Sequence, residues 1–337
     1  MKKLGFLLLL TALVWAAGFA PDQRHLVPAQ PPFTALGRTS AHGGVGCGVL
    51  IAPDLLLTCA HCVSNPQRQV YDDVEVEFGL GFYPTTHRAR LSEAYMAQNA
   101  TSEIDAGQDW AIVRLDRPLG LYYGWLNCQY LSDSEWPEAE VELLGYCGCP
   151  EEARPQFGHM DRPYRCPGAV SDVGPQIVFH NCAMWGGTSG APLLARTDSG
   201  YRLVGLNFAG VSLEDEVLQH GFRDTYTKRL ANLAIPARNW RSQLEQLSSA
   251  PVLPLRTVWV KNRSKRSLRV SATYRSIFSE PDSPPARTEL LQVPPRAQRV
   301  LLTREQGCAD AELSLQVDDK QTMRKALNTT VTILNLP

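Results

Sequence analysis

The chain has 337 residues, a formal net charge of −1, and 44% hydrophobic against 20% charged residues. A chain of this length and composition can bury a large core, which excludes a mainly disordered protein and predicts one large domain with an appendage, or two domains. The balanced charge gives no general attraction to nucleic acid or to an anionic membrane, so neither partner is expected.

The first twenty residues have the pattern of a secretory signal peptide. Two lysines precede an apolar run, which ends in small residues that allow cleavage after Gly18 or Ala20. The run is too short to span a bilayer comfortably, although an uncleaved membrane anchor is the alternative. The sequence therefore predicts a secreted or periplasmic protein without stable membrane insertion.

A proline-rich leader over residues 21–35 is expected to be extended and poorly ordered. From residue 36 to 247, short apolar runs separated by Gly, Pro, Asn and Asp predict many β-strands in a barrel or sandwich. Examples are residues 48–52, 74–80, 110–115, 141–146, 176–181 and 202–208. Residues 235–247 predict a helix with one apolar face, formed by Ile235, Trp240, Leu244 and Leu247.

The C-terminal part follows a Pro- and Ser-containing linker over residues 248–255. Six candidate strands over residues 256–337 predict a small antiparallel β-sandwich of unknown role. The basic run over residues 261–269 is interpreted as a solvated hairpin turn, and a patch that binds a surface or polymer is the alternative.

Nine cysteines suit an exported chain, in which most are expected to form disulfides. Zinc binding by Cys147, Cys149, Cys166 and Cys182 is the alternative, but the C-x-C spacing is not the usual one for zinc. Because nine is odd, at least one thiol stays free or pairs with another molecule, and Cys308, remote from the others, is the candidate.

The stretch GGTSGAPLL over residues 186–194 surrounds one serine with very small side chains. It predicts either a tight surface turn or a nucleophile, Ser189, whose neighbours leave backbone N–H groups free to face a substrate oxygen. A nucleophilic serine needs a base and an orienting acid.

Two further stretches contain candidates for the base and the acid. His61 lies in LTCAHC, where a strand, a turn and a second strand would bring Cys47 beside Cys62; a histidine that merely sits in a cysteine-rich loop is the alternative. Asp109 begins the apolar run DWAIVRL, as a carboxylate or as a simple turn residue, and Asp105 competes with it.

Together and in this order, GCGVLI…LTCAHC, DWAIVRL and GGTSGAPLL resemble the histidine, aspartate and serine segments of the trypsin/chymotrypsin-like serine peptidase family. The resemblance covers about residues 36–247 and implies an all-β fold of two six-stranded antiparallel β-barrels, to which the C-terminal β-sandwich is added. The order His, Asp, Ser also excludes an α/β-hydrolase, in which the serine comes first.

The resemblance implies a role for each of these residues. Ser189 would attack the peptide carbonyl, His61 would take and return the proton, and Asp109 would orient the imidazole. The backbone N–H groups of Gly187 and Ser189 would form the oxyanion hole. The implied protein is a monomeric serine endopeptidase that acts on a protein or peptide and uses no metal or cofactor.

The sequence departs from trypsin and chymotrypsin at Thr188, where those enzymes have an aspartate that receives a newly cut N-terminus. No Ile-Val-Gly-Gly segment occurs upstream. The usual zymogen switch therefore cannot operate here. Thr188 and Ala191 are more similar to the bacterial branch of the family, which includes glutamyl endopeptidases.

Alignment from Ser189 places Ala183 and Met184 at the base of the specificity pocket. The wall strand along which a substrate would pair is then formed by Asn207, Phe208, Ala209 and Gly210. The expected pocket contains no Asp that would bind a basic substrate side chain, and its wall contains no His that would bind a glutamate. We therefore expect an uncharged, apolar or small residue before the cleaved bond.

The resemblance also implies a disulfide between Cys47 and Cys62, and a cross-strand bridge between Cys166 and Cys182 is expected from the hairpin they flank. No pairing is predicted for Cys59, Cys128, Cys147 and Cys149. Two alternatives to the enzyme stay open. One is a catalytically silent protein that uses the peptidase fold for binding, and the other is a surface-binding protein that acts through its C-terminal module.

Overall fold

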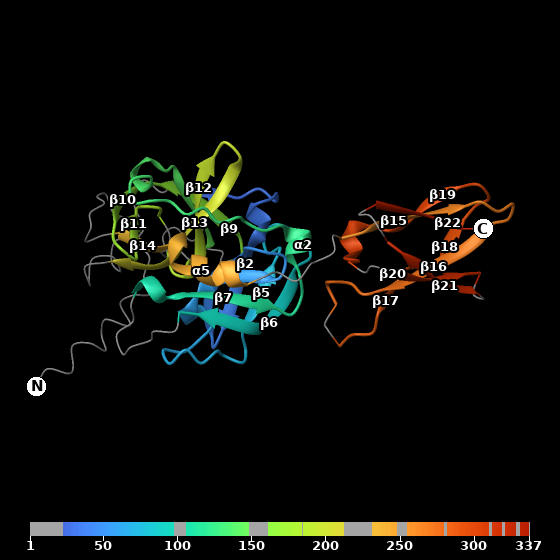
Figure 1. Ribbon diagram of the computed structural model, residues 1–337, viewed down its shortest axis with the longest axis horizontal. Coiled ribbons are helices and arrows are strands. Elements are labelled where there is room, and N and C mark those ends of the chain that lie inside the picture. The colour runs from blue at the N-terminus through green and yellow to red at the C-terminus, as the bar shows by residue number, and fades with distance from the viewer. Residues whose placement is uncertain are drawn as a thin grey trace, which may run out of the picture. The chain divides into compact units, whose positions relative to one another are not determined.

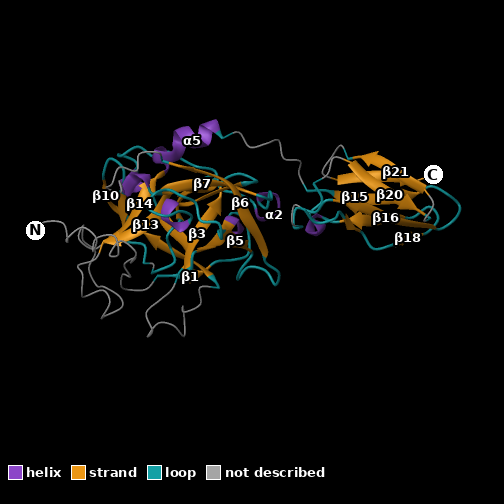
Figure 2. Cartoon of the chain, turned by 90° about the horizontal axis from the view of Figure 1, so that it is seen from below, coloured by secondary structure: helices purple, strands orange, loops and turns teal. Residues whose placement is uncertain are grey.

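The computed structural model describes residues 23–97, 106–147, 161–183, 185–211, 231–247, 255–279, 282–309, 312–318, 321–327 and 331–336. The chain forms two compact units. The first comprises Met1–Leu115 and Tyr123–Ser248, and the second comprises Asp116–Tyr122 and Ser249–Pro337. Strands dominate both units (Figures 1 and 2).

The first unit contains a closed antiparallel barrel in the order β2-β3-β4-β7-β6-β5 (Figure 1). Its strands are β2 (Leu36–Ala41), β3 (Gly44–Leu50), β4 (Leu55–Cys59), β5 (Glu75–Phe78), β6 (His87–Met96) and β7 (Trp110–Leu115). All five residues of β4 are buried, because this strand is covered on both faces. A continuous apolar run is what a strand in that position requires.

The pairing of β4 with β7 decides where the two strands end relative to each other. Their register runs from Leu55 opposite Arg114 to Cys59 opposite Trp110. The residues just after β4 and just before β7 therefore lie at the same end of the barrel. There the chain makes a single 3₁₀ turn, η2 (Ala60–Cys62), and another, η3 (Ala106–Gln108), precedes β7.

The second half of the first unit is an eight-stranded antiparallel sheet in the order β1-β9-β8-β12-β13-β14-β11-β10. The strands are β1 (His25–Leu26), β8 (Val141–Tyr146), β9 (Pro163–Gly168), β10 (Val170–Val173), β11 (Val178–His180), β12 (Ala191–Thr197), β13 (Gly200–Val211) and β14 (Ala231–Pro236). The predicted all-β fold class is confirmed. The second barrel, expected to have six strands, is here a sheet to which the leader adds β1.

The leader differs from the expectation of poor order over its described residues. His25 and Leu26 pair with Arg165 and Tyr164 of β9, and Arg24 is almost fully buried. Its guanidinium donates to Cys147 Sγ at 3.3 Å. The signal segment of residues 1–20 lies outside the described residues, within which no helix is both long and apolar enough to cross a membrane.

The helix expected over residues 235–247 begins later than the sequence pattern indicated. Ile235 belongs to β14, where it pairs with Leu206 of β13. The helical part consists of η6 (Ala237–Trp240) and α5 (Arg241–Gln246). Sheet pairing overrides helical periodicity at Ile235, whereas Trp240 is fully buried, as an apolar helix face requires. The remaining helical turns are η1 (Phe33–Ala35), α2 (Gly120–Tyr123), η4 (Trp136–Glu138) and η7 (Arg304–Gln306).

The second unit contains two sheets with a common core, in agreement with the predicted sandwich. One sheet has the order β19-β15-β22, from β15 (Thr257–Asn262), β19 (Gln298–Leu302) and β22 (Val331–Leu336). The other is formed by β16 (Leu268–Tyr274), β17 (Ala286–Arg287), β18 (Leu291–Val293), β20 (Glu312–Val317) and β21 (Gln321–Ala326). Both contribute fully buried side chains to the core, among them Val260 and Val270.

Two details of the sandwich correct the sequence interpretation. β15 and β22 pair in parallel, so the module is not purely antiparallel. The basic run over residues 261–269 joins β15 of one sheet to β16 of the other, and so it is a crossing turn instead of a hairpin turn. The buried Asn262 side chain closes this turn by donating to the carbonyl oxygens of Arg266 and Val293.

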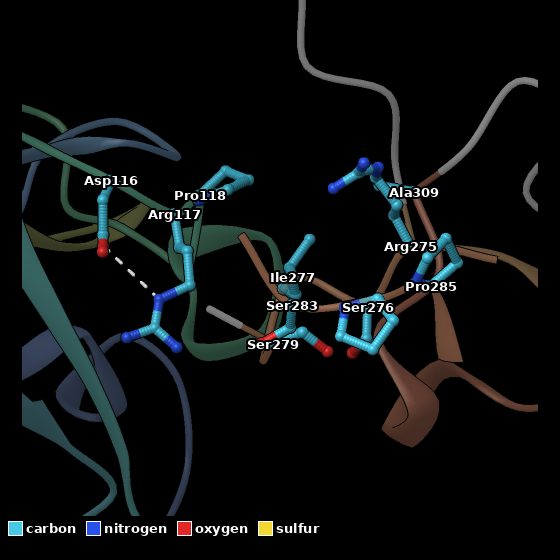
Figure 3. A pocket seen from close by; sticks show the side chains of 11 residues that line it. Asp116, Arg117, Pro118, Arg275, Ser276, Ile277, Ser279, Ser283, Pro285 and Ala309 are labelled. Carbon is cyan, nitrogen blue, oxygen red and sulfur yellow. Dashed lines mark hydrogen bonds and ion pairs between the residues drawn. The ribbon is translucent and has the colours of Figure 1, made fainter. Parts of the chain in front are cut away.

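Elsewhere in this unit, Arg117 forms an ion pair with Asp116, with 3.4 Å between Nε and Oδ1 (Figure 3).

Candidate active site

His61 and Asp109 are brought together at the end of the first barrel. His61 lies in η2, directly after β4, and Asp109 precedes β7, so the β4–β7 pairing makes them neighbours. Asp109 Oδ1 accepts from the backbone N–H of His61 at 3.0 Å, and Asp109 Oδ2 lies 2.5 Å from His61 Nδ1. Both carboxylate oxygens of Asp109 therefore contact His61. Asp105, the competing candidate, lies outside the described residues.

The charge of Asp109 changes the proton affinity of the imidazole. Burial alone would lower the pKa of His61, but the charge of Asp109, the neighbouring Cys62 and the hydrogen bond to Asp109 together raise that pKa well above its usual value. The His61 side chain is 44% exposed, against 11% for that of Asp109. Water therefore weakens both the burial effect and the charge effect at the imidazole, while the carboxylate stays sheltered.

Ser189 lies in the turn that leads into β12. Gly190 follows it with a φ of +84°, and a Cβ there would lie 2.0 Å from the carbonyl oxygen of Cys47. Only glycine allows this close approach of the turn to β3. The backbone N–H groups of Gly187 and Ser189 donate to no acceptor among the residues that the structure describes, so both stay available to a ligand.

Several contacts join the serine turn to the histidine side. The carbonyl oxygen of Ser189 accepts from the backbone N–H of Cys47 at 2.7 Å and from Cys62 Sγ at 3.6 Å. The thiol of Cys47 also donates to the carbonyl oxygen of Gly187 at 3.2 Å. The Ser189 hydroxyl itself donates to the carbonyl oxygen of Phe208 at 3.4 Å instead of to His61. Ser189 thus lies beside the residue that follows His61, with its hydroxyl turned toward β13.

A buried neutral network holds the serine turn from the other side. Thr188 Oγ1 donates to the carbonyl oxygen of Trp185 at 2.9 Å. Asn207 Nδ2 donates to the carbonyl oxygen of Thr188 at 3.0 Å and to its Oγ1 at 3.2 Å. His180 Nε2 in turn lies 3.1 Å from Asn207 Oδ1. Four side-chain hydrogen bonds therefore fix the turn without a charged group.

His180 is fully buried in this network as a neutral imidazole. Because Asn207 uses its Nδ2 as the donor to Thr188, its Oδ1 accepts from His180 Nε2–H. His180 Nδ1 is buried and has no hydrogen-bond partner among the described residues. A proton there would be a buried charge without an acceptor, and burial lowers the pKa of His180 to about 4.

Of the residues aligned with the substrate wall, Asn207 forms the first β12–β13 pair, and residues 208–210 lie outside that pairing. Asn207 pairs with Ala191, and its side chain is turned into the neutral network. Ala209 and Gly210 pair only with β14, because β12 begins at Ala191. One backbone edge of residues 208–210 is thus not used by β12. Ala183 is buried, and Met184 lies outside the described residues.

The eight described cysteines are free thiols, so the two expected disulfides are not formed in this structure. The partners are nonetheless close. Gly46, next to Cys47, lies so near Cys62 that a Cβ on it would be 2.7 Å from Cys62 Sγ. Cys166 Sγ accepts from the backbone N–H of Ala183, the residue after Cys182, at 3.1 Å. Cys308 is buried in the sandwich core, and Cys149 lies outside the described residues.

Nothing in the sequence indicated that His180 and Arg68 belong to the site, and Asn207 was expected there in a different role. His180 was read only as part of a strand, and Asn207 only as part of a substrate wall. Arg68, whose Nη1 lies 4.0 Å from Asp109 Oδ1, belongs to a loop with no motif. Their roles depend on contacts between residues far apart in the chain, for which no local sequence pattern exists.

The comparisons agree with this architecture. Residues 46–206 match the family model of the trypsin-like peptidase domain. No curated protein matches the chain. Among solved structures, that of a Glu endopeptidase in complex with MPD is similar, with a TM-score of 0.54 and 18% identity over 68% of this chain and 99% of the other. At this identity the likeness shows the fold alone.

Proposed function

The chain belongs, through the domain over residues 46–206, to the trypsin-like serine peptidases, and on this premise we propose that it is a secreted serine endopeptidase. His61, Asp109 and Ser189 are its triad. The observation that carries the proposal is that both carboxylate oxygens of Asp109 accept from His61, next to a turn in which the N–H groups of Gly187 and Ser189 donate to no acceptor among the described residues. A binding protein without turnover would have no need for this arrangement.

In the proposed reaction the Ser189 hydroxyl leaves the carbonyl oxygen of Phe208 and turns toward His61. His61 Nε2 takes its proton while Oγ bonds to the substrate carbonyl carbon, and the resulting oxyanion accepts from the N–H groups of Gly187 and Ser189. The C–N bond then breaks as His61 gives the proton to the leaving amine. Water hydrolyses the acyl-enzyme by the same steps in reverse, which frees the hydroxyl of Ser189.

Asp109 keeps the imidazole in the tautomer that this reaction needs. Its Oδ2 accepts from Nδ1–H, which leaves Nε2 without a proton and able to act as a base. The raised pKa of His61 follows from the same charge, which stabilises the imidazolium formed in each half of the reaction. Asp109 therefore acts through His61 and does not touch the substrate.

The substrate is proposed to be an extended peptide that pairs with the backbone edge of residues 208–210. An unpaired strand edge binds a peptide through its main chain, whatever the sequence of that peptide. Selectivity then depends on the pocket for the residue before the cleaved bond. Ala183 offers no charge there, which supports an uncharged, apolar or small side chain.

The signal segment, the cysteine pairs and the β-sandwich are proposed to suit a secreted protein. The signal segment directs export, and oxidation there would join Cys47 to Cys62 and Cys166 to Cys182, which already lie close together. A Cys47–Cys62 bridge would tie η2 to β3 beside the serine turn. The β-sandwich, as a separate compact unit, would serve to retain the enzyme on a surface or polymer.

A fluorophosphonate probe tests the proposal directly, because it reacts only with a serine that a neighbouring base activates. We expect labelling at Ser189, located by mass spectrometry, and hydrolysis of a peptide library by the full chain. Ser189→Ala should abolish both, leaving less than about 10⁻⁴ of the rate. A folded wild-type chain that neither labels nor cleaves would instead support the silent binding protein.

A further inference from the structure

Charge is distributed unevenly between the two parts of the chain. The C-terminal module over residues 256–337 contains fourteen Lys or Arg and eight Asp or Glu residues, which gives it a formal charge of +6. The complete chain has a charge of −1, so residues 1–255 together carry −7. The balanced total therefore hides a module that is basic enough to attract anions.

One end of the β-sandwich is built from two turns that a single buried side chain joins. The crossing turn leads from β15 to β16, and a second turn over residues 294–297 leads from β18 to β19. Asn262 Nδ2 donates to the carbonyl oxygens of Arg266 at 2.7 Å and of Pro294 at 3.1 Å, and its backbone N–H donates to that of Ala297 at 2.9 Å. Because Asn262 is fully buried, these hydrogen bonds are sheltered from water and hold the two turns together.

Five exposed cationic side chains gather on these two turns and are named the basic end. They are Lys261, Arg263, Lys265 and Arg266 of the crossing turn and Arg296 of the second turn. Among the residues that the structure describes, only Asp318 forms an ion pair with the basic end, at 3.2 Å from an Arg266 side chain that stays 76% exposed. Most of the positive charge at this end is therefore not neutralised by an acidic side chain of the described residues.

The backbone at Arg296 adds a second, independent observation. Arg296 has a φ of +62°, in the left-handed region that favours glycine. The backbone N–H of Ala297 donates to the carbonyl oxygen of Pro294 at 3.2 Å, so Arg296 occupies the third position of a tight turn. Glycine would adopt this conformation without strain, and the needs of the turn therefore do not explain the arginine. Its guanidinium also adds to the repulsion among like charges at the basic end.

An anionic polymer would relieve this repulsion, because its repeated charges can pair with several cations at once. We propose that the basic end binds an acidic polysaccharide, and that this binding retains the peptidase where such polymers accumulate outside the cell. The inference rests on the proposed function in one respect, since export is what brings the chain to such a polymer. Three of the five cations are arginines, whose planar guanidinium groups pair well with carboxylates.

The surroundings of the basic end favour a polysaccharide over two other polyanions. Neither turn contains an aromatic side chain on which the bases of a single-stranded nucleic acid could stack. The exposed large hydrophobic residues of the module, Leu290, Val331 and Ile333, belong to neither turn. The basic end therefore offers no apolar side chain for insertion into an anionic membrane.

Polygalacturonate, which carries a carboxylate on each sugar, is the probe, and uncharged dextran is the matched polymer control. We expect the full chain to raise the fluorescence anisotropy of labelled polygalacturonate at low salt and to leave that of labelled dextran unchanged. Binding should weaken as the salt concentration is raised, because salt screens attraction between exposed charges.

Two double variants of equal charge locate the binding surface. Lys265→Gln with Arg296→Gly removes two cations from the basic end, and the affinity for polygalacturonate should fall about tenfold. Glycine also relieves the strain at position 296, so unfolding does not account for the loss, which a thermal melt checks. Arg324→Gln with Lys325→Gln removes the same charge from β21, which belongs to neither turn, and should bind within about twofold of the wild type.

The Ser189→Ala variant separates this inference from the proposed function, because binding needs no turnover. It should bind polygalacturonate as the wild type does, and a chain that binds without any peptidase activity refutes the peptidase alone. A chain that binds polygalacturonate no better than dextran would overturn the inference. Equal losses in the two double variants would do the same, because net charge would then be the cause. Tighter binding to single-stranded DNA or to anionic phospholipid vesicles than to polygalacturonate would overturn the choice of a polysaccharide.

Discussion

The two halves of the candidate site are held in place by different physical means. On the first barrel, a carboxylate and an imidazole form a hydrogen-bonded pair that reaches the surface, with 44% of the His61 side chain exposed. On the second sheet, Thr188, Asn207 and His180 hold the serine turn by neutral hydrogen bonds, and all three are buried. The first half uses a charged carboxylate near solvent, and the second uses hydrogen bonds between buried neutral groups.

The difference follows from what each half must do in the proposed reaction. The base has to gain and lose a proton, so a nearby charge and access to water are useful to it. The oxyanion site has only to keep two N–H groups in position, and a rigid uncharged frame does this without changing protonation state. At position 188, where trypsin and chymotrypsin have an aspartate, this frame contains an uncharged threonine that is hydrogen-bonded to Trp185 and Asn207.

The strongest test of the comparison removes the charge from the first half. Asp109→Asn keeps the size of the side chain but offers an amide to His61 Nδ1, which favours the tautomer with the proton on Nε2. We expect the rate of peptide hydrolysis to fall by about 10⁴-fold near neutral pH. Steady-state kinetics on a peptide substrate measure the loss.

The control for Asp109→Asn is its thermal stability, because one hydrogen bond to the backbone N–H of His61 can persist. A variant that melts near the wild-type temperature attributes the loss to the tautomer instead of to unfolding. Activity within tenfold of wild type would contradict the role of Asp109 and would shift attention to Asp105.

The second test uses acid to charge the neutral half. In the unfolded chain an ordinary histidine binds a proton below about pH 6.5, whereas the folded chain keeps His180 neutral down to about pH 4. The unfolded state therefore binds more protons between these values, and the free energy of unfolding falls as the pH is lowered through that window. His180 alone should lower the free energy of unfolding by about 3 kcal/mol between pH 6.5 and pH 4, and by little more below pH 4.

Urea unfolding of the wild type and of His180→Gln at pH 7 and pH 4 isolates this contribution, because all other groups are shared. The signal is tryptophan fluorescence, to which the fully buried Trp136 and Trp240 of the first unit contribute. We expect the wild type to lose about 3 kcal/mol more than the variant. Equal losses would mean that His180 is not held neutral, and the contrast between the two halves would disappear.

The sequence predicted the charged half better than the neutral half. His61 and Asp109 each adjoin an apolar strand, and a continuous apolar run can be recognised locally in the sequence. The expected run over residues 110–115 coincides with β7, and β7 pairs with β4. The neutral half depends on Asn207 meeting Thr188 and His180, which lie 19 and 27 positions away. No periodic pattern in the sequence predicts these contacts.

The errors outside the site have a similar origin. Ile235 fits a helical face in the sequence, but pairing with Leu206 makes it part of a strand. The leader is rich in proline and yet contributes β1, because β9 has an edge that it can pair with. The parallel pairing of β15 with β22 joins residues at opposite ends of the module. In each case a partner distant in the chain decides the structure.

The mildest test trims one hydrogen-bonding group from the neutral half. Thr188→Val removes the hydroxyl that donates to Trp185 and accepts from Asn207. Asn207 can still donate to the carbonyl oxygen of residue 188, at 3.0 Å in the present structure, so the turn loosens without being released. We expect kcat to fall about tenfold, which corresponds to about 1.4 kcal/mol, with KM nearly unchanged because the substrate-pairing edge stays intact.

Thr188→Ser is the matched control, since it keeps the hydroxyl and removes only a methyl group. Its kcat should stay within about threefold of wild type, as expected for a substitution that preserves the hydrogen bonds. A purely structural role would lower the melting temperature of both variants without separating their kcat values. If Thr188→Val were as active as the wild type, the N–H groups of Gly187 and Ser189 would be positioned by Cys47 and Gly190 alone, and the neutral network would serve stability instead of catalysis.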